Sequence, residues 1–437
     1  MLRSGTPLAL VCASLFAYSA SYADPGVGSA DEVIQWNKTL LTIVRTPGAQ
    51  PATVHSTRSF AIMHAAVYDA VNAIDATHQP YLVRVEHVSH HASQEAAAAA
   101  AAHETLVALY PTFQTTLDQQ YDQALAQIPD SADKTTGIDV GKAVALAILA
   151  LRSDDGSAAT PPLFNFVNAP GDYQSTPPNF PPQPAFTHWS RVTPFALERA
   201  KQFRPGPPPA LTSAEYTAVF NEVKSIGILN STAATADQAL IGKFWNGTIQ
   251  NYWNEITQTA AQAHHLTTAQ SARVFALLNI TLADEVIAFY DAKYTYNFWR
   301  PVTAIRAAAA DGNPDTAADT NWLPQATKTG TDPSYPGAHA AISSGGAFVL
   351  SAFFGDKPFH LVVTSEVLPG VVRSFDSFAD AEKEASLSRI YAGQHFRSDE
   401  NTGEKLGSAV ADFVVDHFLT RLHKGGEDDG HKERSDN

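Results

Sequence analysis

The chain has 437 residues, 44% of them hydrophobic, and its 29 basic and 44 acidic side chains give a formal net charge of −15. A chain of this length can bury a large core in one domain or in two closely packed lobes, and its acidic excess argues against a nucleic-acid partner. The single cysteine, Cys12, lies in an N-terminal apolar stretch, so the rest of the chain has no disulfide, thiol nucleophile or cysteine metal ligand.

Residues 1–23 have the pattern of a secretory signal peptide. Arg3 precedes an apolar run over residues 8–20, and small residues form a cleavage site before Asp24. We therefore expect a secreted or periplasmic protein whose mature chain begins at Asp24. Its net charge would be −16, because cleavage removes one positive charge and no negative charge from the total of −15.

Helical patterns dominate the N-terminal half. Apolar residues at helical spacing predict helices over residues 31–46, 93–110, 111–128 and 138–152. Either Thr57 or Ser59 is expected to cap another helix, which contains His64 and Asp69. For these two residues we favour hydrogen-bonded core roles over catalytic ones, because single buried histidines usually serve structure.

Residues 153–209 interrupt the helices. Repeated Pro-Pro pairs exclude a regular helix, and the aromatic residues between them favour packing over disorder. We predict an ordered belt that crosses the helices and lines the entrance to a site.

The C-terminal half returns to helical patterns. We predict helices over residues 213–226, 235–256 and 267–298, and a final helix that Ser398 caps and that runs to residue 423. Residues 338–355 are uncharged, but histidine, serine and glycine interrupt them, which is typical of a buried core helix, so we expect no transmembrane segment in the mature chain.

The predicted fold is all-α, with two packed helical bundles and a long, ordered, Pro-rich loop. The predicted organisation is a signal peptide (1–23), an N-terminal helical lobe (24–210) that includes the belt (153–209), a C-terminal helical bundle (211–424) and a disordered tail (425–437).

Four residues of the C-terminal bundle form a candidate anion site. Lys293 and Arg300 are seven residues apart, which returns them to nearly the same helical face after two turns. Arg389 adds a third cation and His395 an imidazole. In a strongly acidic chain, this local concentration of basic groups suits a small anionic ligand.

Helix ends complete the predicted site. Gly337 and Ala338 precede a long apolar run, so their backbone N–H groups are expected at a helix N-terminus, where anions bind. Pro301 is a natural helix start, and Gly393 a natural helix stop. Together these residues predict an oxyanion cradle in the C-terminal bundle.

The cradle resembles the three-part signature shared by the vanadium-dependent haloperoxidases and the type 2 phosphatidic acid phosphatases. That signature reads Lys-x6-Arg-Pro, Pro-Ser-Gly-His and Ser-Arg-x5-His-x3-Asp. The corresponding residues here are Lys293/Arg300/Pro301, then Pro336/Gly337/Ala338/His339, then Ser388/Arg389/His395/Asp399. Residues 58–72 and the segment from Trp189 to Leu197 resemble the soluble, chloroperoxidase-like branch.

The resemblance implies distinct roles for two histidines. His395 would attack phosphorus in a phosphatase or ligate vanadium in a haloperoxidase, and His339 would be the acid–base group. The implied cofactor is vanadate, bound by Lys293, Arg300, Gly337, Ala338, Arg389 and His395, and a phosphatase would need none. Asp399 either orients an imidazole or is a plain helix N-terminal acid.

Two departures from the signature limit what carries over. Gly337 replaces the serine and removes one hydroxyl contact, so restoring it as Gly337→Ser is expected to strengthen vanadate binding. Asp332 stands where related chloroperoxidases have an aromatic residue of the halide pocket. Its negative charge should repel halide, which makes bromide a better candidate substrate than chloride.

Three functions remain open. The first is a haloperoxidase that uses vanadate and hydrogen peroxide to oxidise a halide, and the second is a soluble acid phosphatase that forms a phosphohistidine. The third is an oxyanion-binding protein without turnover. The expected partners are accordingly small anions, hydrogen peroxide and a halide or phosphate ester. Simple pairing of these cations with acidic residues would not require their order and spacing.

Overall fold

The structure is a computed structural model that describes residues 31–355 and 359–422. The predicted signal peptide, 1–23, and tail, 425–437, lie outside the described residues. The described part is mainly helical, which confirms the predicted all-α class. Among its helices, none combines the length and apolar character needed to cross a membrane.

The N-terminal helices follow the predicted pattern. They are α1 (Glu32–Arg45), α2 (Ser56–Asp75), α3 (Gln94–Leu109), α4 (Gln114–Ala126) and α5 (Ala132–Leu151). The alanine run of α3 and the glycines of α5 allow these two helices to pack closely. A Cβ atom added at Gly137 would lie 3.2 Å from the Ala96 Cβ, and one at Gly141 would lie 2.8 Å from the Ala100 Cβ.

The C-terminal half contains the longest helix and those that carry the cradle. Its helices are α6 (Ala214–Ile226), α7 (Ala236–Phe244), α8 (Ile249–Ala263), α9 (Thr268–Tyr296), α10 (Pro301–Ala307), α11 (Ala338–Phe354), α12 (Phe378–Tyr391) and α13 (Arg397–His417). Short 3₁₀ turns occupy Pro111–Phe113, Trp189–Arg191 and Ala308–Ala310.

Three elements differ from what the sequence predicted. The single helix expected over residues 235–256 is broken between α7 and α8, where Gly247 packs so closely that a Cβ atom would lie 2.9 Å from the Tyr252 ring. Strands β1 (Leu361–Thr364) and β2 (Val372–Phe375) form an antiparallel pair that was not predicted. The last helix ends at His417, six residues before the predicted end.

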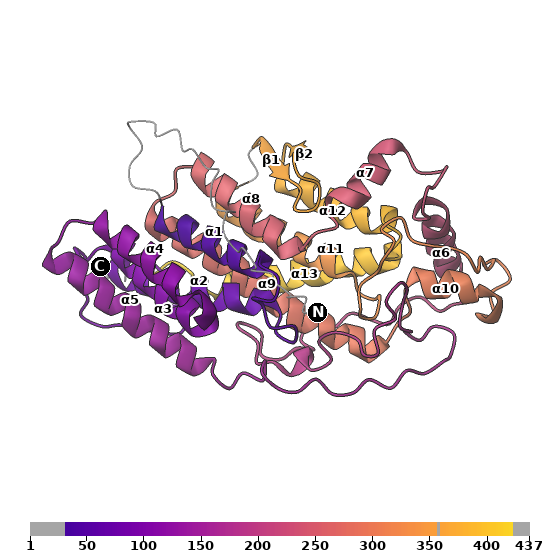
Figure 1. The fold of residues 1–437 in the computed structure, drawn as a ribbon, viewed down its shortest axis with the longest axis horizontal. Coiled ribbons are helices and arrows are strands. Elements are labelled where there is room, and N and C mark those ends of the chain that lie inside the picture. Colours follow the sequence, from indigo (N-terminus) through magenta and orange to yellow (C-terminus); the bar gives the residue numbers. More distant parts are fainter. Residues whose placement is uncertain (1–30, 356–358, 423–437) are drawn as a thin grey trace, which may run out of the picture. The chain divides into compact units, whose positions relative to one another are not determined.

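Helix α9 links the two halves of the described chain (Figure 1). It packs against α2 on the N-terminal side and against α11 and α13 on the C-terminal side. The main hydrophobic cluster runs continuously from α1 to α13, and a smaller one surrounds α6 and α10. The proposed boundary at residues 210 and 211 stays a prediction.

Helices α2 and α9 share an internal pattern. An arginine and an aspartate stand eleven residues apart in each, as Arg58/Asp69 and Arg273/Asp284. Asp69 accepts backbone N–H groups of residues 81–83, and Asp284 accepts those of residues 195–197 at 2.6 to 2.7 Å. Asp284 thereby ties the belt to the helix that carries Lys293.

The belt is ordered, and it hydrogen-bonds to two segments that carry site residues. Within residues 153–209 the one regular element is the 3₁₀ turn at Trp189–Arg191, as the Pro-rich composition predicted. The Tyr173 N–H donates to the Asn297 carbonyl at 2.7 Å, and the Ala185 N–H donates to the Thr331 carbonyl at 2.8 Å. The belt therefore fixes both the end of α9 and the loop that precedes α11.

Candidate active site

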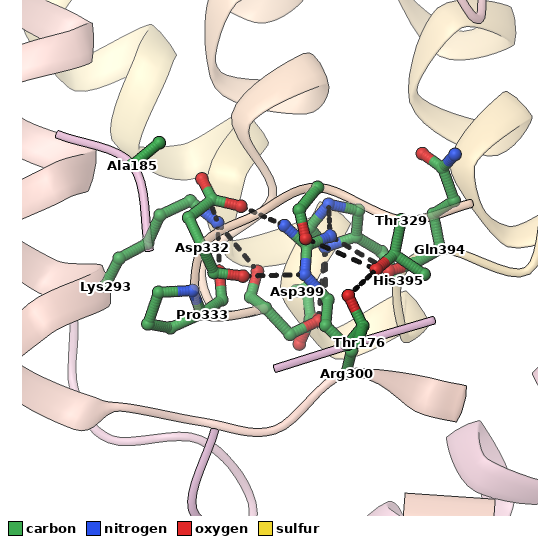
Figure 2. A network of polar contacts seen from close by, with 12 residues as sticks. Thr176, Ala185, Lys293, Arg300, Thr329, Asp332, Pro333, Gln394, His395 and Asp399 are labelled. Carbon is green, nitrogen blue, oxygen red and sulfur yellow. Dashed lines mark hydrogen bonds and ion pairs between the residues drawn. The ribbon is translucent and has the colours of Figure 1, made fainter. Parts of the chain in front are cut away.

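Helix ends bring the predicted cradle residues together. Lys293 lies in the last turn of α9, Arg300 is the N-cap of α10 and Arg389 lies in the last turn of α12. After α12 the chain makes a left-handed turn at Gly393, whose φ is 73°, and His395 lies two residues further on. Figure 2 shows Lys293 and Arg300 on either side of Asp332, with His395 beside the arginine.

Lys293 is completely buried at the end of α9. Its Nζ donates to the Pro333 carbonyl at 2.5 Å and to the Ser334 carbonyl at 3.1 Å, and lies 3.7 Å from a carboxylate oxygen of Asp332. Burial lowers the pKa of Lys293 to about 8, against the opposing effect of the Asp332 charge. Two carbonyls and one carboxylate therefore fix the direction of this ammonium group.

Arg300 joins Asp332 to His395. Its guanidinium forms an ion pair with the Asp332 carboxylate, and its Nε donates to the Asp332 carbonyl at 2.9 Å. Its second terminal nitrogen donates to the Gln394 carbonyl at 3.1 Å and lies 2.8 Å from His395 Nε2. Arg300 is thus held on three sides.

The His395 ring has a defined tautomer. Because a guanidinium can only donate, His395 Nε2 must accept from Arg300, and the ring proton is on Nδ1. That Nδ1 lies 3.3 Å from both Asp399 and the Ser334 hydroxyl, which itself donates to Asp399 at 2.5 Å. Burial, and then the charge of Arg300, lower the pKa of His395 well below its usual value. The ring is therefore neutral, with its lone pair on Nε2.

Asp399 has both of the roles that the sequence left open. Its carboxylate accepts the Phe396 N–H at 3.0 Å at the start of α13 and also faces the His395 ring. Phe396, and not Ser398, is the N-cap of this helix, because Ser398 already lies inside it. Burial raises the pKa of Asp399 to about 6, opposed mainly by the hydrogen bond from Ser334.

The Arg389 guanidinium has N–H groups without a hydrogen-bond acceptor in the described chain. Its side chain is buried, its Nε has no hydrogen-bond partner in the described chain, and its NH1 makes one long contact of 3.4 Å to Asn246. Burial lowers the pKa of Arg389 to about 10, which still leaves it charged at neutral pH. Glu400 is a buried acid whose charge acts on Arg389, and the unused N–H donors of this buried cation remain available to a bound anion.

His339 lies in the first turn of α11, which begins after Gly337 as predicted. Its Nε2 lies 3.1 Å from the Trp245 carbonyl, which the break between α7 and α8 exposes, so Nε2–H donates and Nδ1 remains an acceptor. Burial, and then the charge of Arg389, lower the pKa of His339 well below its usual value.

One of the backbone N–H groups at the start of α11 already has an acceptor within the protein. The Gly337 N–H donates to the Asp399 carbonyl at 2.8 Å, so it is used within the protein. The next N–H groups, beginning with Ala338, have no partner inside the helix. We therefore expect the backbone contact to an anion to come from Ala338.

The structure adds four residues that the sequence did not single out. They are Ser334, Asn246, Gln394 and Glu400. Ser334, Gln394 and Glu400 each lie within two positions of a signature residue, whereas Asn246 had no sequence signal. Asn246 and Gln394 hydrogen-bond to each other at 3.2 Å although they are 148 positions apart in the sequence.

The cradle fits a tetrahedral or trigonal-bipyramidal oxyanion such as vanadate or phosphate. The fit rests on the unpartnered Arg389 Nε, the buried Lys293 and the neutral His395 with its lone pair on Nε2. Three cations and a helix N-terminus supply fixed positive potential, which needs little reorganisation when an anion binds.

Comparison with known proteins gives a consistent result. Residues 273–424, which contain all three signature motifs, match the family described as the VCPO second helical-bundle domain. The vanadium chloroperoxidase of Curvularia inaequalis is 24% identical over 363 residues, with 64% of this chain and 59% of that protein covered. The chain therefore spans less than two thirds of that relative's length.

Solved structures extend the similarity to most of the chain. A structure described as the first bacterial vanadium-dependent iodoperoxidase has a TM-score of 0.75 and 26% identity, covering 89% of this chain and 96% of that one. The holo form of a bacterial vanadium-dependent chloroperoxidase has a TM-score of 0.66 at 14% identity, with 89% and 97% covered, and shows the shared fold. The signature motifs therefore lie in a region that matches the VCPO second helical-bundle domain, on a fold that the chain shares with vanadium-dependent haloperoxidases.

Proposed function

We propose that the chain is a haloperoxidase that oxidises a halide with hydrogen peroxide at a vanadate held by His395. The observation that carries the proposal is the neutral His395 ring, whose Nε2 accepts a hydrogen bond from Arg300 and whose pKa is lowered by burial and then by the charges of Arg300, Lys293 and Arg389. Similarity to an iodoperoxidase and to chloroperoxidases supports the reaction class.

The oxyanion would be held by the positive charges of the cradle and by one bond to His395 Nε2. Lys293, Arg300 and Arg389 balance its negative charge, and each hydrogen bond to such a charged group contributes about 1.5–3 kcal/mol. Ser334 and Asp399 keep the Nδ1 proton of His395 in place, so that Nε2 remains the donor atom. Bound vanadate supplies a Lewis-acidic centre that makes peroxide a stronger oxidant.

His339 is the residue suited to acid–base work. The Trp245 carbonyl fixes its Nε2–H, which leaves Nδ1 able to accept a proton from hydrogen peroxide as it enters. Its lowered pKa keeps it in the acceptor form near neutral pH.

The surroundings of Asp332 favour the more easily oxidised halides. Burial, and then the charge of the nearby Asp332, raise the pKa of the Tyr173 and Tyr294 phenols. A carboxylate among aromatic rings disfavours a small, strongly hydrated anion. We therefore propose bromide or iodide as the substrate in preference to chloride, and the similarity to an iodoperoxidase adds support for iodide.

A phosphatase is the second candidate, because the same observation favours it. A neutral imidazole with an unprotonated Nε2 is also what attack on phosphorus requires, and His395 would then carry the phosphoryl group. An oxyanion-binding protein without turnover is the third candidate.

Paired assays on one preparation decide among these functions. One measures hydrolysis of a phosphate ester without vanadate, and the other measures peroxide-dependent bromination and iodination with vanadate. We expect halide oxidation that requires vanadate, at a rate far above hydrolysis. Hydrolysis alone would identify the phosphatase, and vanadate binding without either reaction would identify the binding protein.

We also propose that the protein is exported, from the signal-peptide pattern of residues 1–23. The mass of the protein recovered outside the cytoplasm should correspond to a chain that begins at Asp24. A cytoplasmic protein that retains residues 1–23 would contradict export.

A further inference from the structure

The space beside Gly337 is occupied by another residue. A Cβ atom added at Gly337 would overlap Glu400 Oε1 and lie 2.7 Å from its Cδ. Real Cβ atoms do not approach other groups so closely, so a side chain at position 337 and the Glu400 carboxyl group exclude each other.

Glu400 is held in this place by the packing of α11 and α13. Its side chain is buried in the first turn of α13, and Gly403, one turn later, lets the two helices approach. A Cβ atom at Gly403 would lie 3.0 Å from the Ala340 Cβ. The backbone therefore leaves Glu400 little freedom to move away from Gly337.

The carboxyl group of Glu400 lies on the Nδ1 side of His395, and its charge also acts on the cradle cation Arg389. Its Oε1 lies 3.6 Å from His395 Nδ1, and neither of its oxygens has a hydrogen-bond partner in the part of the chain that the structure describes. Buried polar atoms normally have partners, so two unpartnered oxygens beside a candidate binding site point to a ligand or to a neighbour that moves.

We propose that Glu400 is a positioning residue of the oxyanion site, and that its carboxyl group takes the place of the serine side chain that Gly337 lacks. This inference rests on the proposed function, because the oxyanion is the ligand of that site. The two positions depend on each other. Because Gly337 has no side chain, the Glu400 carboxyl group can occupy the space beside it, next to His395.

The pair changes the expectation for Gly337→Ser. From the sequence alone, the added hydroxyl was expected to strengthen vanadate binding. In the structure the new side chain meets Glu400, so the single substitution must displace that residue from a packed interface. We now expect Gly337→Ser to weaken binding unless Glu400 is shortened at the same time.

The test combines the two substitutions. Gly337→Ser, Glu400→Ala and the double variant are compared with the full-length protein by calorimetric titration with orthovanadate and with inorganic phosphate. Melting temperatures without ligand are measured in parallel. Asp412→Ala removes an exposed acid from the same helix and serves as the control, with expected wild-type affinity and melting temperature.

We expect each single substitution to weaken binding about tenfold, and the double variant to recover to within about threefold of the wild type. The melting temperature should fall in Gly337→Ser and rise again when Glu400→Ala is added. If the wild type binds and the two losses simply add, the inference is overturned while the proposed function stands. If the wild type binds neither ion, the proposed function fails and the inference fails with it.

Discussion

His395 Nε2 and the Arg300 guanidinium lie 2.8 Å apart, so the atom assigned to bind vanadium or attack phosphorus accepts a hydrogen bond from a cradle cation. An oxyanion that bonds to Nε2 must take over this contact. Arg300 can then turn its donor to the anion, because its pairing with Asp332 keeps it in the site. The same arginine would thus donate to the Nε2 lone pair in the unliganded site and to the oxyanion once it is bound.

Asp332 competes with external anions for two cations. It pairs with Arg300 and lies 3.7 Å from Lys293 Nζ, so Asp332→Asn should free both for a ligand. We expect phosphate to bind about tenfold more tightly, which corresponds to about 1.4 kcal/mol. Calorimetric titration measures this directly.

The control for this substitution is Asp315→Asn, which removes one exposed acid with the same change in net charge. Its phosphate affinity should be that of the wild type. Weaker phosphate binding by Asp332→Asn would show that Asp332 supports anion binding, contrary to this expectation.

His64 should make the protein lose stability in acid. Burial lowers its pKa to about 3, and its Nε2 donates to Asn37 at 2.9 Å in the N-terminal core. The unfolded chain binds a proton below about pH 6.5 while the folded chain does not, so stability falls as the pH falls through this window. At pH 5 the loss from His64 is about 2 kcal/mol relative to pH 7.

The internal pattern of α2 and α9 supplies the test. Asn279 occupies the position in α9 that His64 has in α2, and it pairs with Asn254 at 3.0 Å. His64→Asn should therefore keep a polar pair with Asn37 but lose the pH dependence. Denaturant unfolding at pH 7 and pH 5 should show a smaller loss in the variant, and an unchanged loss would refute the assignment.

Close packing of α11 and α13 should depend on Gly407. A Cβ atom at this position would lie 2.8 Å from the Ala341 carbonyl carbon, so Gly407→Ala must push apart the helices that carry His339 and Asp399. We expect a loss of about 1–3 kcal/mol in the free energy of unfolding. Gly206→Ala, whose added Cβ atom would meet no heavy atom within 4 Å beyond its chain neighbours, should change it by less than about 0.5 kcal/mol. Equal effects at both positions would contradict the packing argument.

The sequence predicted those parts of the site that depend on local order. Pro301 and Gly393 are strong helix signals, and the structure has a helix start and a left-handed turn at these residues. The spacing of the cations and histidines also predicted the cradle, because residues that act at one site occur at characteristic spacings in the sequence.

Contacts between distant segments were not predictable in this way. Glu400 reaches Gly337 through the approach of two helices, and an acid beside Asp399 looks like an ordinary first-turn residue. The break between α7 and α8, which gives His339 its carbonyl partner, depends on tertiary packing around Gly247. Local propensity contains no information on such contacts.

The central claim is that His395 binds the oxyanion while His339 handles protons. Titration of orthovanadate into the wild type, His395→Ala and His339→Ala, with halide oxidation measured on the same samples, tests it directly. His417→Ala removes an exposed imidazole and is the control. We predict that His395→Ala loses vanadate affinity by on the order of 100-fold and all halide oxidation, whereas His339→Ala keeps its affinity within about threefold and loses most activity. Near wild-type vanadate affinity or activity in His395→Ala would contradict the account.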